Sequence, residues 1–177
     1  MPKEILLGVT GSIAAYKAAD LANMLTKAGH TVHVILTKSA MEFITPLTFR
    51  SITKQRVYTD MFEDIIHEDI RHISLAQRAA VAVCAPATAN IIGKLACGIA
   101  DDMLSTVLMA TKAPILLAPA MNTAMYENPI VQENITKLVH HGITIVEPRE
   151  SLLACGDLGK GAMAELPIIM NNILKFC

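Results

Sequence analysis

The chain has 177 residues, 53% of them hydrophobic and 18% charged, a length and composition that suit one domain with a sizeable core. Its formal net charge of −1 argues against a nucleic acid or an anionic membrane as partner, and no apolar run approaches the length of a membrane-spanning helix. Four cysteines without a CxxC pair indicate a reducing, cytoplasmic location rather than a disulfide framework. The apolar excess predicts a parallel sheet covered on both faces, and contacts between subunits.

The N-terminal stretch is typical of a strand, a glycine loop, a helix and a second strand. Residues 4–9 form a short apolar run, GVTGS (8–12) follows, residues 13–29 have helical spacing, and TVHVIL (31–36) is again strand-like. This order opens a doubly wound α/β domain. A signal peptide does not explain the stretch, because Glu4 lies in the would-be basic region and polar residues interrupt the apolar run.

The loop at 8–12 is a candidate phosphate site, since free amides at a helix N-terminus attract anions. It lacks the GxGxxG spacing of a dinucleotide site, and the second strand ends in Thr37, Lys38 and Ser39 rather than in an acidic residue for ribose hydroxyls. Two hydroxyls and a lysine suit a phosphate. The pattern therefore favours a mononucleotide such as flavin mononucleotide (FMN) over NAD, and the alternative is a tight turn without a ligand.

The stretch from 40 to 79 is less regular. Residues 40–51 are predicted to form a helix with a break or restart at Pro46, residues 56–58 a short edge strand, and the acidic segment 60–69 a solvated loop. His72 opens a short helix, and from its local context alone it is more simply a packed or capping histidine. His67 and His72 are spaced wrongly for a shared metal, and no metal site is expected.

Two further strands end in polar motifs. The strand at 80–85 runs into PATAN (86–90), and the strand at 114–118 runs into PAMN (119–122), which places donors at the carboxyl ends of strands, where open α/β sheets bind ligands. Helices are predicted at 91–100, 101–110, 129–141 and 166–176, and a last strand at 144–146. The fold class expected is α/β: a three-layer, Rossmann-like (flavodoxin-like), doubly wound parallel sheet of about five strands in a single domain, 1–177.

The segment 153–165, LACGDLGKGAMAE, combines Cys155 with three glycines beyond the last predicted strand. Glycine at this density is typical of a chain that turns sharply, approaches something closely or moves. A flap that carries a thiol over a site is one interpretation, and a surface loop with an incidental cysteine is the other. With polar motifs at several strand ends and no nucleophile elbow or paired carboxylates, the pattern indicates an enzyme whose cofactor does the chemistry.

In these motifs the sequence resembles the homo-oligomeric flavin-containing cysteine decarboxylases of the flavoprotein family. The resemblance covers nearly the whole chain and is carried by six motifs in order: GSIAAYK (11–17), TKSA (37–40), HISL (72–75), PATAN (86–90), PAMNTAMY (119–126) and ACGDLGKGAMAE (154–165). It implies FMN as cofactor and a trimer or a dodecamer of trimers. It also implies decarboxylation of 4'-phosphopantothenoylcysteine to 4'-phosphopantetheine in coenzyme A biosynthesis, with no ligase domain fused to the chain.

The resemblance also implies roles for individual residues. His72 would be the active-site histidine, Asn122 would bind the substrate carboxylate, and Cys155 would donate a proton from a flap at 151–166. The substrate would further contact Met125, Ala154 and Gly156. The FMN-binding residues would be Gly11, Ser12, Ile13, Thr37, Lys38, Ser39, Thr88, Ala89, Asn90, Ile91 and Ala120.

The implied mechanism oxidises the thiol-bearing carbon of the substrate to a thioaldehyde, releases carbon dioxide, and reduces the resulting ene-thiol with a proton from Cys155. Ala162 stands where many bacterial relatives have an arginine. The alternatives are a peptidyl-cysteine decarboxylase with the same chemistry, a non-catalytic regulatory flavin-binding subunit, and a flavodoxin-like electron carrier.

Overall fold

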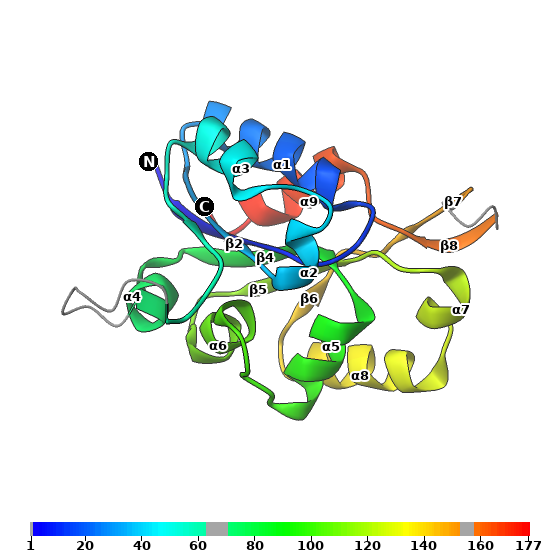
Figure 1. The fold of residues 1–177 in the computed structure, drawn as a ribbon. Coiled ribbons are helices and arrows are strands. Elements are labelled where there is room, and N and C mark those ends of the chain that lie inside the picture. The colour runs from blue at the N-terminus through cyan, green and yellow to red at the C-terminus, as the bar shows by residue number, and fades with distance from the viewer. Residues whose placement is uncertain (1, 63–70, 153–157) are drawn as a thin grey trace.

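The structure is a computed structural model that describes residues 2–62, 71–152 and 158–177. Within these residues a parallel sheet of six strands has the order β3-β2-β1-β4-β5-β6 (Figure 1). All its neighbouring strands run in the same direction, and β1 pairs with both β2 and β4. The strands are β1 (Glu4–Val9), β2 (Thr31–Leu36), β3 (Val57–Tyr58), β4 (Val81–Ala87), β5 (Ile115–Pro119) and β6 (Thr144–Ile145).

Helices cover both faces of this sheet, because the strands carry apolar side chains on alternate sides. On β1, Ile5 and Leu7 face one buried cluster and Leu6 faces the other. The first face packs against α1 (Ala15–Lys27), α3 (Pro46–Thr53) and α9 (Leu166–Leu174). The second packs against α4 (Arg71–Arg78), α5 (Ala89–Cys97), α6 (Met103–Ala110) and α8 (Pro129–His140) (Figure 1). The expected doubly wound three-layer fold is confirmed, and each of the six strands of the sheet overlaps a segment expected to be a strand.

Residues at the helix ends explain where several helices begin and end. Pro46 does mark a restart: residues 38–53 form α2 (Lys38–Met41) and α3, with the proline in the first turn of α3, where its missing N–H costs nothing. Asp102 caps α6 in a capping box with Ser105. Gly29, just beyond α1, has φ +88°, a conformation that glycine adopts without strain.

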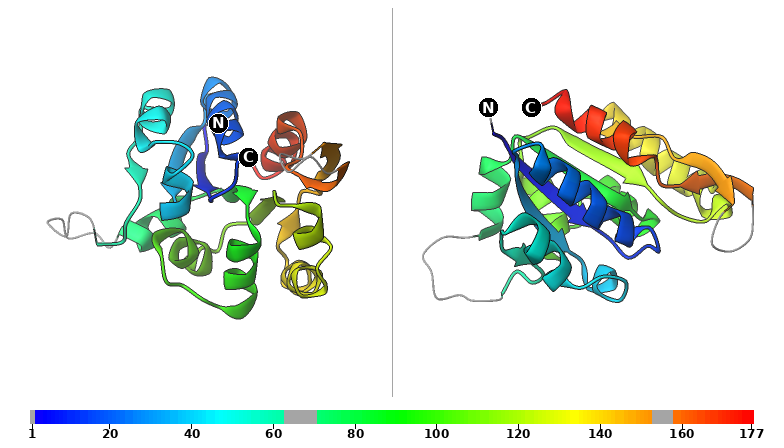
Figure 2. Two further views of the ribbon diagram at one scale, coloured as in Figure 1. Left: turned by 45° about the vertical axis from the view of Figure 1, so that its right-hand side comes forward. Right: turned by 90° about the horizontal axis from the view of Figure 1, so that it is seen from above.

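The prediction that 144–146 is the last strand is wrong. After β6 the chain forms an antiparallel hairpin of β7 (Arg149–Leu152) and β8 (Leu158–Ala162), which projects beyond the sheet in Figures 1 and 2. The glycines in β8 mask its strand character, because glycine has a low strand propensity. The short helix α7 (Thr123–Tyr126) was also missed, since four residues carry no helical period.

The strand order positions the site. The connections from β1 lead outward to β2 and β3, whereas β4, β5 and β6 extend the sheet in the other direction. At such a reversal the loops after neighbouring strands diverge and leave a crevice at the carboxyl ends. The loops after β1, β2, β4 and β5 all reach this edge, and the sequence motifs lie on them.

Candidate functional site

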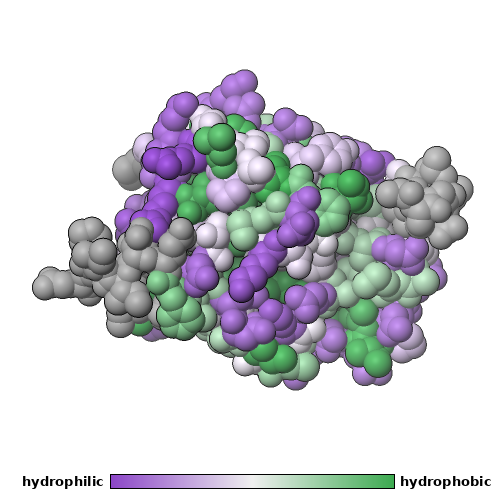
Figure 3. All heavy atoms as spheres, in the orientation of Figure 1, coloured by the Kyte–Doolittle hydropathy of each residue, from purple (hydrophilic) through white to green (hydrophobic). Residues whose placement is uncertain are grey.

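A cavity of about 1050 Å³ lies at the carboxyl ends of β1, β2, β4 and β5. Its size falls at the upper end of the range for small-molecule and cofactor sites. On the molecular face drawn in Figure 3, hydrophilic side chains lie next to hydrophobic ones, without one large apolar patch in the centre. A ligand with both a charged and an apolar part would fit such surroundings.

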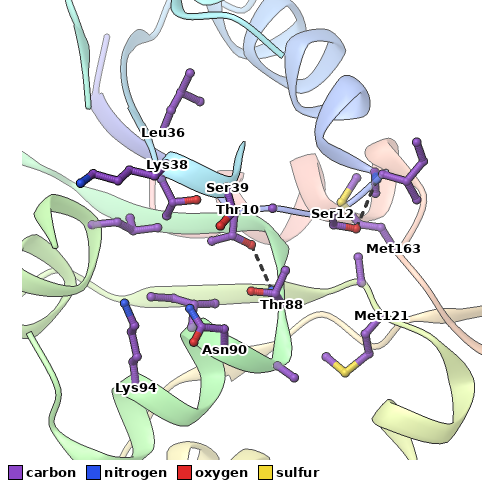
Figure 4. A pocket seen from close by; sticks show the side chains of 18 of the residues that line it. Thr10, Ser12, Leu36, Lys38, Ser39, Thr88, Asn90, Lys94, Met121 and Met163 are labelled. Carbon is purple, nitrogen blue, oxygen red and sulfur yellow. Dashed lines mark hydrogen bonds between the residues drawn. The ribbon is translucent and has the colours of Figure 1, made fainter. Parts of the chain in front are cut away.

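The structure brings together every residue that the resemblance assigned to FMN. They come from loops far apart in the chain and line this one cavity (Figure 4). They are Gly11, Ser12, Ile13, Thr37, Lys38, Ser39, Thr88, Ala89, Asn90, Ile91 and Ala120. Their convergence is a property of the strand order, which the individual motifs do not encode.

Thr10 cross-links two of these loops and was missed as a functional residue. Its hydroxyl donates to the carbonyl oxygen of Pro86 at 2.7 Å and accepts the backbone N–H of Thr88 at 3.1 Å. Thr10 is only 2% exposed, and Figure 4 shows its side chain pointing toward Thr88. Thr10 therefore fixes the loop after β1 against the loop after β4. Its position between Gly8 and Gly11 was the sequence feature that could have identified it as part of the site.

Gly11 brings the first loop against the second. A Cβ atom at Gly11 would lie 2.4 Å from the Cβ of Ser39, so a larger residue cannot take this place without a shift. Ser12 Oγ accepts the N–H of Ala14, and Thr37 Oγ1 accepts the N–H of Ala40, which leaves the N-terminal turns of α1 and α2 well formed. Close backbone approach at a helix N-terminus is the arrangement that binds phosphate.

The donor set fits a flavin mononucleotide. The helices α1, α2 and α5 begin at the cavity, and none of them has an acidic residue in its first turn, so their positive ends are not neutralised from within. Hydroxyls of Ser12, Ser39 and Thr88 and the amine of Lys38 add phosphate donors. Apolar walls from Leu36, Leu104, Met121 and Met163 would suit a planar ring.

A charged cluster forms another part of the wall. Lys94 Nζ lies 2.7 Å from Asp101 Oδ1 and 2.8 Å from Asp102 Oδ2. Burial alone would lower the pKa of Lys94, but the two carboxylates outweigh it and the net shift is upward. Burial would likewise raise the pKa of Asp102, whereas the hydrogen bonds from Lys94 and Ser105 hold it below its usual value. Lys94 is therefore a permanent, compensated cation that joins α5 to α6.

Asn122 and Met125 line the same cavity, as the substrate assignment requires. Asn122 caps α7: its Oδ1 accepts the N–H of Ala124 at 2.8 Å. This bond fixes the orientation of the carboxamide, which can donate only through its nitrogen. Met125 is 50% exposed and flexible in character, consistent with pocket lining rather than core.

The hairpin closes one side of the cavity. The N–H of Met121 donates to the carbonyl oxygen of Gly161 at 3.0 Å, and a Cβ atom at Gly161 would lie 2.3 Å from the Met121 oxygen. A Cβ atom at Gly159 would lie 2.5 Å from Thr123 Oγ1. The glycines of this segment therefore permit close docking of β8 on the loop that carries Asn122. Cys155, Ala154 and Gly156 lie outside the described residues.

His72 is placed only by its helix. It is in the first turn of α4, and its side chain is not among those described. Within the described part of α4 no residue lines the large cavity; Ile73, Ala76 and Gln77 border a separate, smaller depression instead. The assignment of His72 to the site stays a prediction.

The other cysteines are poor candidates for chemistry. Cys84 is fully buried in β4, and burial strongly raises the pKa of its thiol, which keeps it protonated and inert. Cys97 is exposed at the end of α5 and does not line the cavity. Across the described ranges no cluster of His, Cys, Asp and Glu could hold a metal ion, and no helix there has the length and apolarity to cross a membrane.

Comparison with known proteins agrees with the resemblance seen in the motifs. The family model described as Flavoprotein matches residues 1–177. A probable phosphopantothenoylcysteine decarboxylase of Streptococcus mutans is 47% identical over 98% of this chain and 98% of its own length. The coenzyme A biosynthesis bifunctional protein CoaBC of Bacillus subtilis is 50% identical over 98% of this chain, which spans only 42% of that longer protein.

Solved structures show the same fold over the whole chain. A cysteine-to-serine mutant of a PPC decarboxylase, complexed with pantothenoylaminoethenethiol, has a TM-score of 0.89 at 34% identity and covers 99% of this chain and 98% of its own. The FMN-binding protein AtHal3 has a TM-score of 0.88 at 35% identity, with coverage of 99% and 97%. On the match over its full length, together with these likenesses, the chain belongs to the flavoprotein family and its cofactor is a flavin.

Proposed function

We propose that this chain is an FMN-dependent phosphopantothenoylcysteine decarboxylase that converts 4'-phosphopantothenoylcysteine to 4'-phosphopantetheine in coenzyme A biosynthesis. The observation that carries the proposal is the convergence of the phosphate donors, Asn122 and the glycine hairpin around one cavity. The Streptococcus mutans relative, which has almost the same length, supports it. The same chemistry places the protein in the cytoplasm, where thiols stay reduced.

The loops at the carboxyl ends of the strands would bind the cofactor. Ser12, Ser39 and Lys38 would bind the FMN phosphate with the helix N-termini, and Thr88, Ala89, Asn90, Ile91 and Ala120 would border the rest of the molecule. Bound FMN supplies the two-electron oxidation and the later return of the hydride. Thr10 cross-links two of these loops, those after β1 and β4, through hydrogen bonds of the protein itself.

Decarboxylation itself needs an oriented carboxylate and a proton donor. The carboxamide of Asn122, fixed by its bond to Ala124, would bind the carboxylate and align the bond to be broken. Cys155 would protonate the ene-thiol. An ordinary thiol has a pKa of about 8.5, so it carries its proton at neutral pH. His72 would act on or position the cysteinyl part of the substrate.

We also propose that the active form is a homo-oligomer, a trimer or a dodecamer of trimers. Ile13 and Tyr16 border the cavity and are 59% and 57% exposed, which indicates that their apolar surface meets another chain. In such an oligomer, a neighbouring copy would contribute its His72 to this cavity, which residues 73–78 of the same chain do not line. Light scattering on the purified protein measures the oligomer, and a flavin-loaded, fully active monomer would contradict the proposal.

Two measurements test the function. The visible spectrum of the purified protein should show flavin bands, and mass spectrometry should show phosphopantetheine after incubation with phosphopantothenoylcysteine. A colourless protein that cannot be reconstituted with FMN would overturn the cofactor assignment. A yellow protein that leaves the substrate unchanged at stoichiometric enzyme would overturn the reaction.

A peptidyl-cysteine decarboxylase is the second candidate. A solved structure of the peptidyl-cysteine decarboxylase EpiD has a TM-score of 0.84 at 25% identity, so the fold is shared with a peptide-modifying enzyme. A peptide with a C-terminal cysteine, incubated in parallel with phosphopantothenoylcysteine, separates the two: the better substrate by kcat/KM identifies the function.

A further inference from the structure

Arg149, the first residue of β7, has a donor that lacks an acceptor. Arg149 is one of the residues that line the cavity, and its Nε atom lies 2.9 Å from Glu165 Oε1. The two atoms are as close as in an ion pair, but the N–H does not point at the oxygen well enough to form a hydrogen bond. Solvent does not reach Nε, so its hydrogen has no acceptor. A buried donor without an acceptor is uncommon in native proteins and requires an explanation.

The hairpin holds Arg149 at the end of the cavity that carries Asn122. Arg149 is the cross-strand partner of Ala162, and the neighbouring Gly161 accepts the N–H of Met121. Met121 directly precedes Asn122, and all five of these residues border the same cavity. The arginine therefore faces the region in which the substrate, rather than the cofactor phosphate, is expected.

Of the cations around the cavity, Arg149 is the best suited to bind an anion other than the FMN phosphate. Among the described lining residues the cations are Lys17, Lys38, Lys94 and Arg149. Lys94 is held by two carboxylates, Lys38 belongs to the loop assigned to the FMN phosphate, and Lys17 lies in the first turn of α1, which begins at that same phosphate site. Glu165, the partner of Arg149, is 56% exposed on its side chain, so the ion pair is weak and easily exchanged for a better acceptor.

We propose that Arg149 binds an oxyanion of the substrate, its phosphate or its carboxylate, and thereby determines substrate specificity. A guanidinium presents its donors in a planar fork that matches both groups. The incoming oxyanion accepts the buried Nε–H and displaces Glu165 toward solvent. This inference rests on the proposed function, since it takes phosphopantothenoylcysteine as the substrate.

The test combines variants of the hairpin with ligands that differ in one anionic group. Arg149→Gln is compared with Arg149→Lys and with the control Lys160→Gln. Lys160 is a matched cation of the same hairpin: it is 41% exposed, it pairs with Glu147 at 2.7 Å, and it is not among the described cavity-lining residues. The ligands are phosphopantothenoylcysteine, pantothenoylcysteine, which lacks the phosphate, and phosphopantetheine, which lacks the carboxylate.

Arg149→Gln should raise KM for phosphopantothenoylcysteine by about 10- to 100-fold, the value of hydrogen bonds to a charged group, with kcat changed much less. Arg149→Lys should recover part of the loss, and Lys160→Gln should behave as the wild type. If phosphopantetheine binding falls equally and pantothenoylcysteine is unaffected, the oxyanion is the phosphate. The reverse pattern identifies the carboxylate.

Flavin content and the thermal unfolding midpoint are measured for every variant, and Glu165→Gln is added to test a structural role of the ion pair. Glu165→Gln should leave KM unchanged or lower it, because it removes the competing carboxylate. The proposal is overturned if Arg149→Gln loses flavin, affects all three ligands alike, or leaves all of them unaffected, or if Glu165→Gln raises KM as much as Arg149→Gln does. A wild-type protein that binds these ligands in an Arg149-dependent way without product formation would instead refute the proposed reaction.

Discussion

The two walls of the cavity are built on different principles. The strand-end loops continue directly from buried strands, and Thr10 ties two of them together through shielded hydrogen bonds. The hairpin of β7 and β8 is antiparallel, projects from the sheet, and docks through the Met121–Gly161 bond and glycine contacts (Figure 2). The first wall is positioned by the core of the domain, whereas the second is positioned by a few backbone contacts at its base.

Under the proposed function, one wall would bind the cofactor and the other would bind the substrate. A cofactor that remains bound needs a preformed site, which the buried strands provide. A substrate that enters and leaves needs a wall that can be docked and released at small cost, which a glycine-rich hairpin provides. Substitutions in the two walls should therefore have separable effects: flavin retention for the loops, and turnover for the hairpin.

Cys155→Ser should have the largest effect, a loss of turnover of about 10²- to 10⁴-fold, because a serine hydroxyl is a much weaker acid than a thiol. The protein should stay yellow and release or retain the oxidised ene-thiol product. Mass spectrometry of the reaction mixture detects that species. Full turnover by the variant would remove Cys155 from the mechanism.

Gly161→Ala tests whether docking of the hairpin is required. The added Cβ atom would meet the carbonyl oxygen of Met121, and Gly161 has φ +154°, which disfavours other residues. Displacement of the hairpin by about an ångström should lower kcat/KM by about 100-fold while flavin content stays unchanged. Gly142→Ala is the control, because Gly142 also has a positive φ of +87° but has open space around it. Equal activity loss in both variants would contradict a docking role.

Gly11→Ala probes the other wall. Its Cβ atom would overlap Ser39 and force the loops after β1 and β2 apart. Overpacking of this kind costs about 1–3 kcal/mol, so the dissociation constant for FMN should rise roughly 10- to 100-fold. Fluorescence titration of the apoprotein with FMN measures it. Unchanged FMN affinity together with lost turnover would contradict the proposal that this wall holds the flavin.

Thr10→Val should lower the free energy of unfolding by about 2 kcal/mol, because the Thr88 N–H loses its acceptor and the Pro86 carbonyl loses a donor in a buried site. Denaturant titration of the apoprotein measures the change. Thr106→Val, which removes a partly exposed hydroxyl on α6, should cost less than Thr10→Val. An equal cost would show that the cross-link adds nothing beyond local packing.

Asp102→Asn should have the smallest effect, about 1 kcal/mol or less, because asparagine still caps α6 and the carboxylate is partly exposed. The pKa of Asp102 is lowered by its hydrogen bonds from Lys94 and Ser105, which outweigh burial, so its charge stabilises the fold above the unfolded pKa of about 4. The difference from wild type should be constant near neutrality and disappear as the pH falls below that value. A difference that persists in acid would point to capping rather than charge.

The sequence by itself determined the local elements and the family. Strand runs such as TVHVIL, the helical spacing of residues 13–29 and the proline restart depend on neighbours within a few residues, and these predictions are confirmed. The order of motifs also identified the family, because several unusual segments recur at fixed spacing. The hairpin was hidden because glycines carry no side-chain pattern, and α7 because it is too short to show a period.

Only the tertiary structure decided which of these segments meet. The strand order set by β1 pairing with both β2 and β4 brings loops 76 and more residues apart into hydrogen-bonding distance through Thr10. The contact of Arg149 Nε with Glu165 likewise joins two different elements, β7 and the start of α9. Local sequence fixes φ, ψ and capping, but the position of a cavity follows from long-range strand pairing and burial, which no single motif contains.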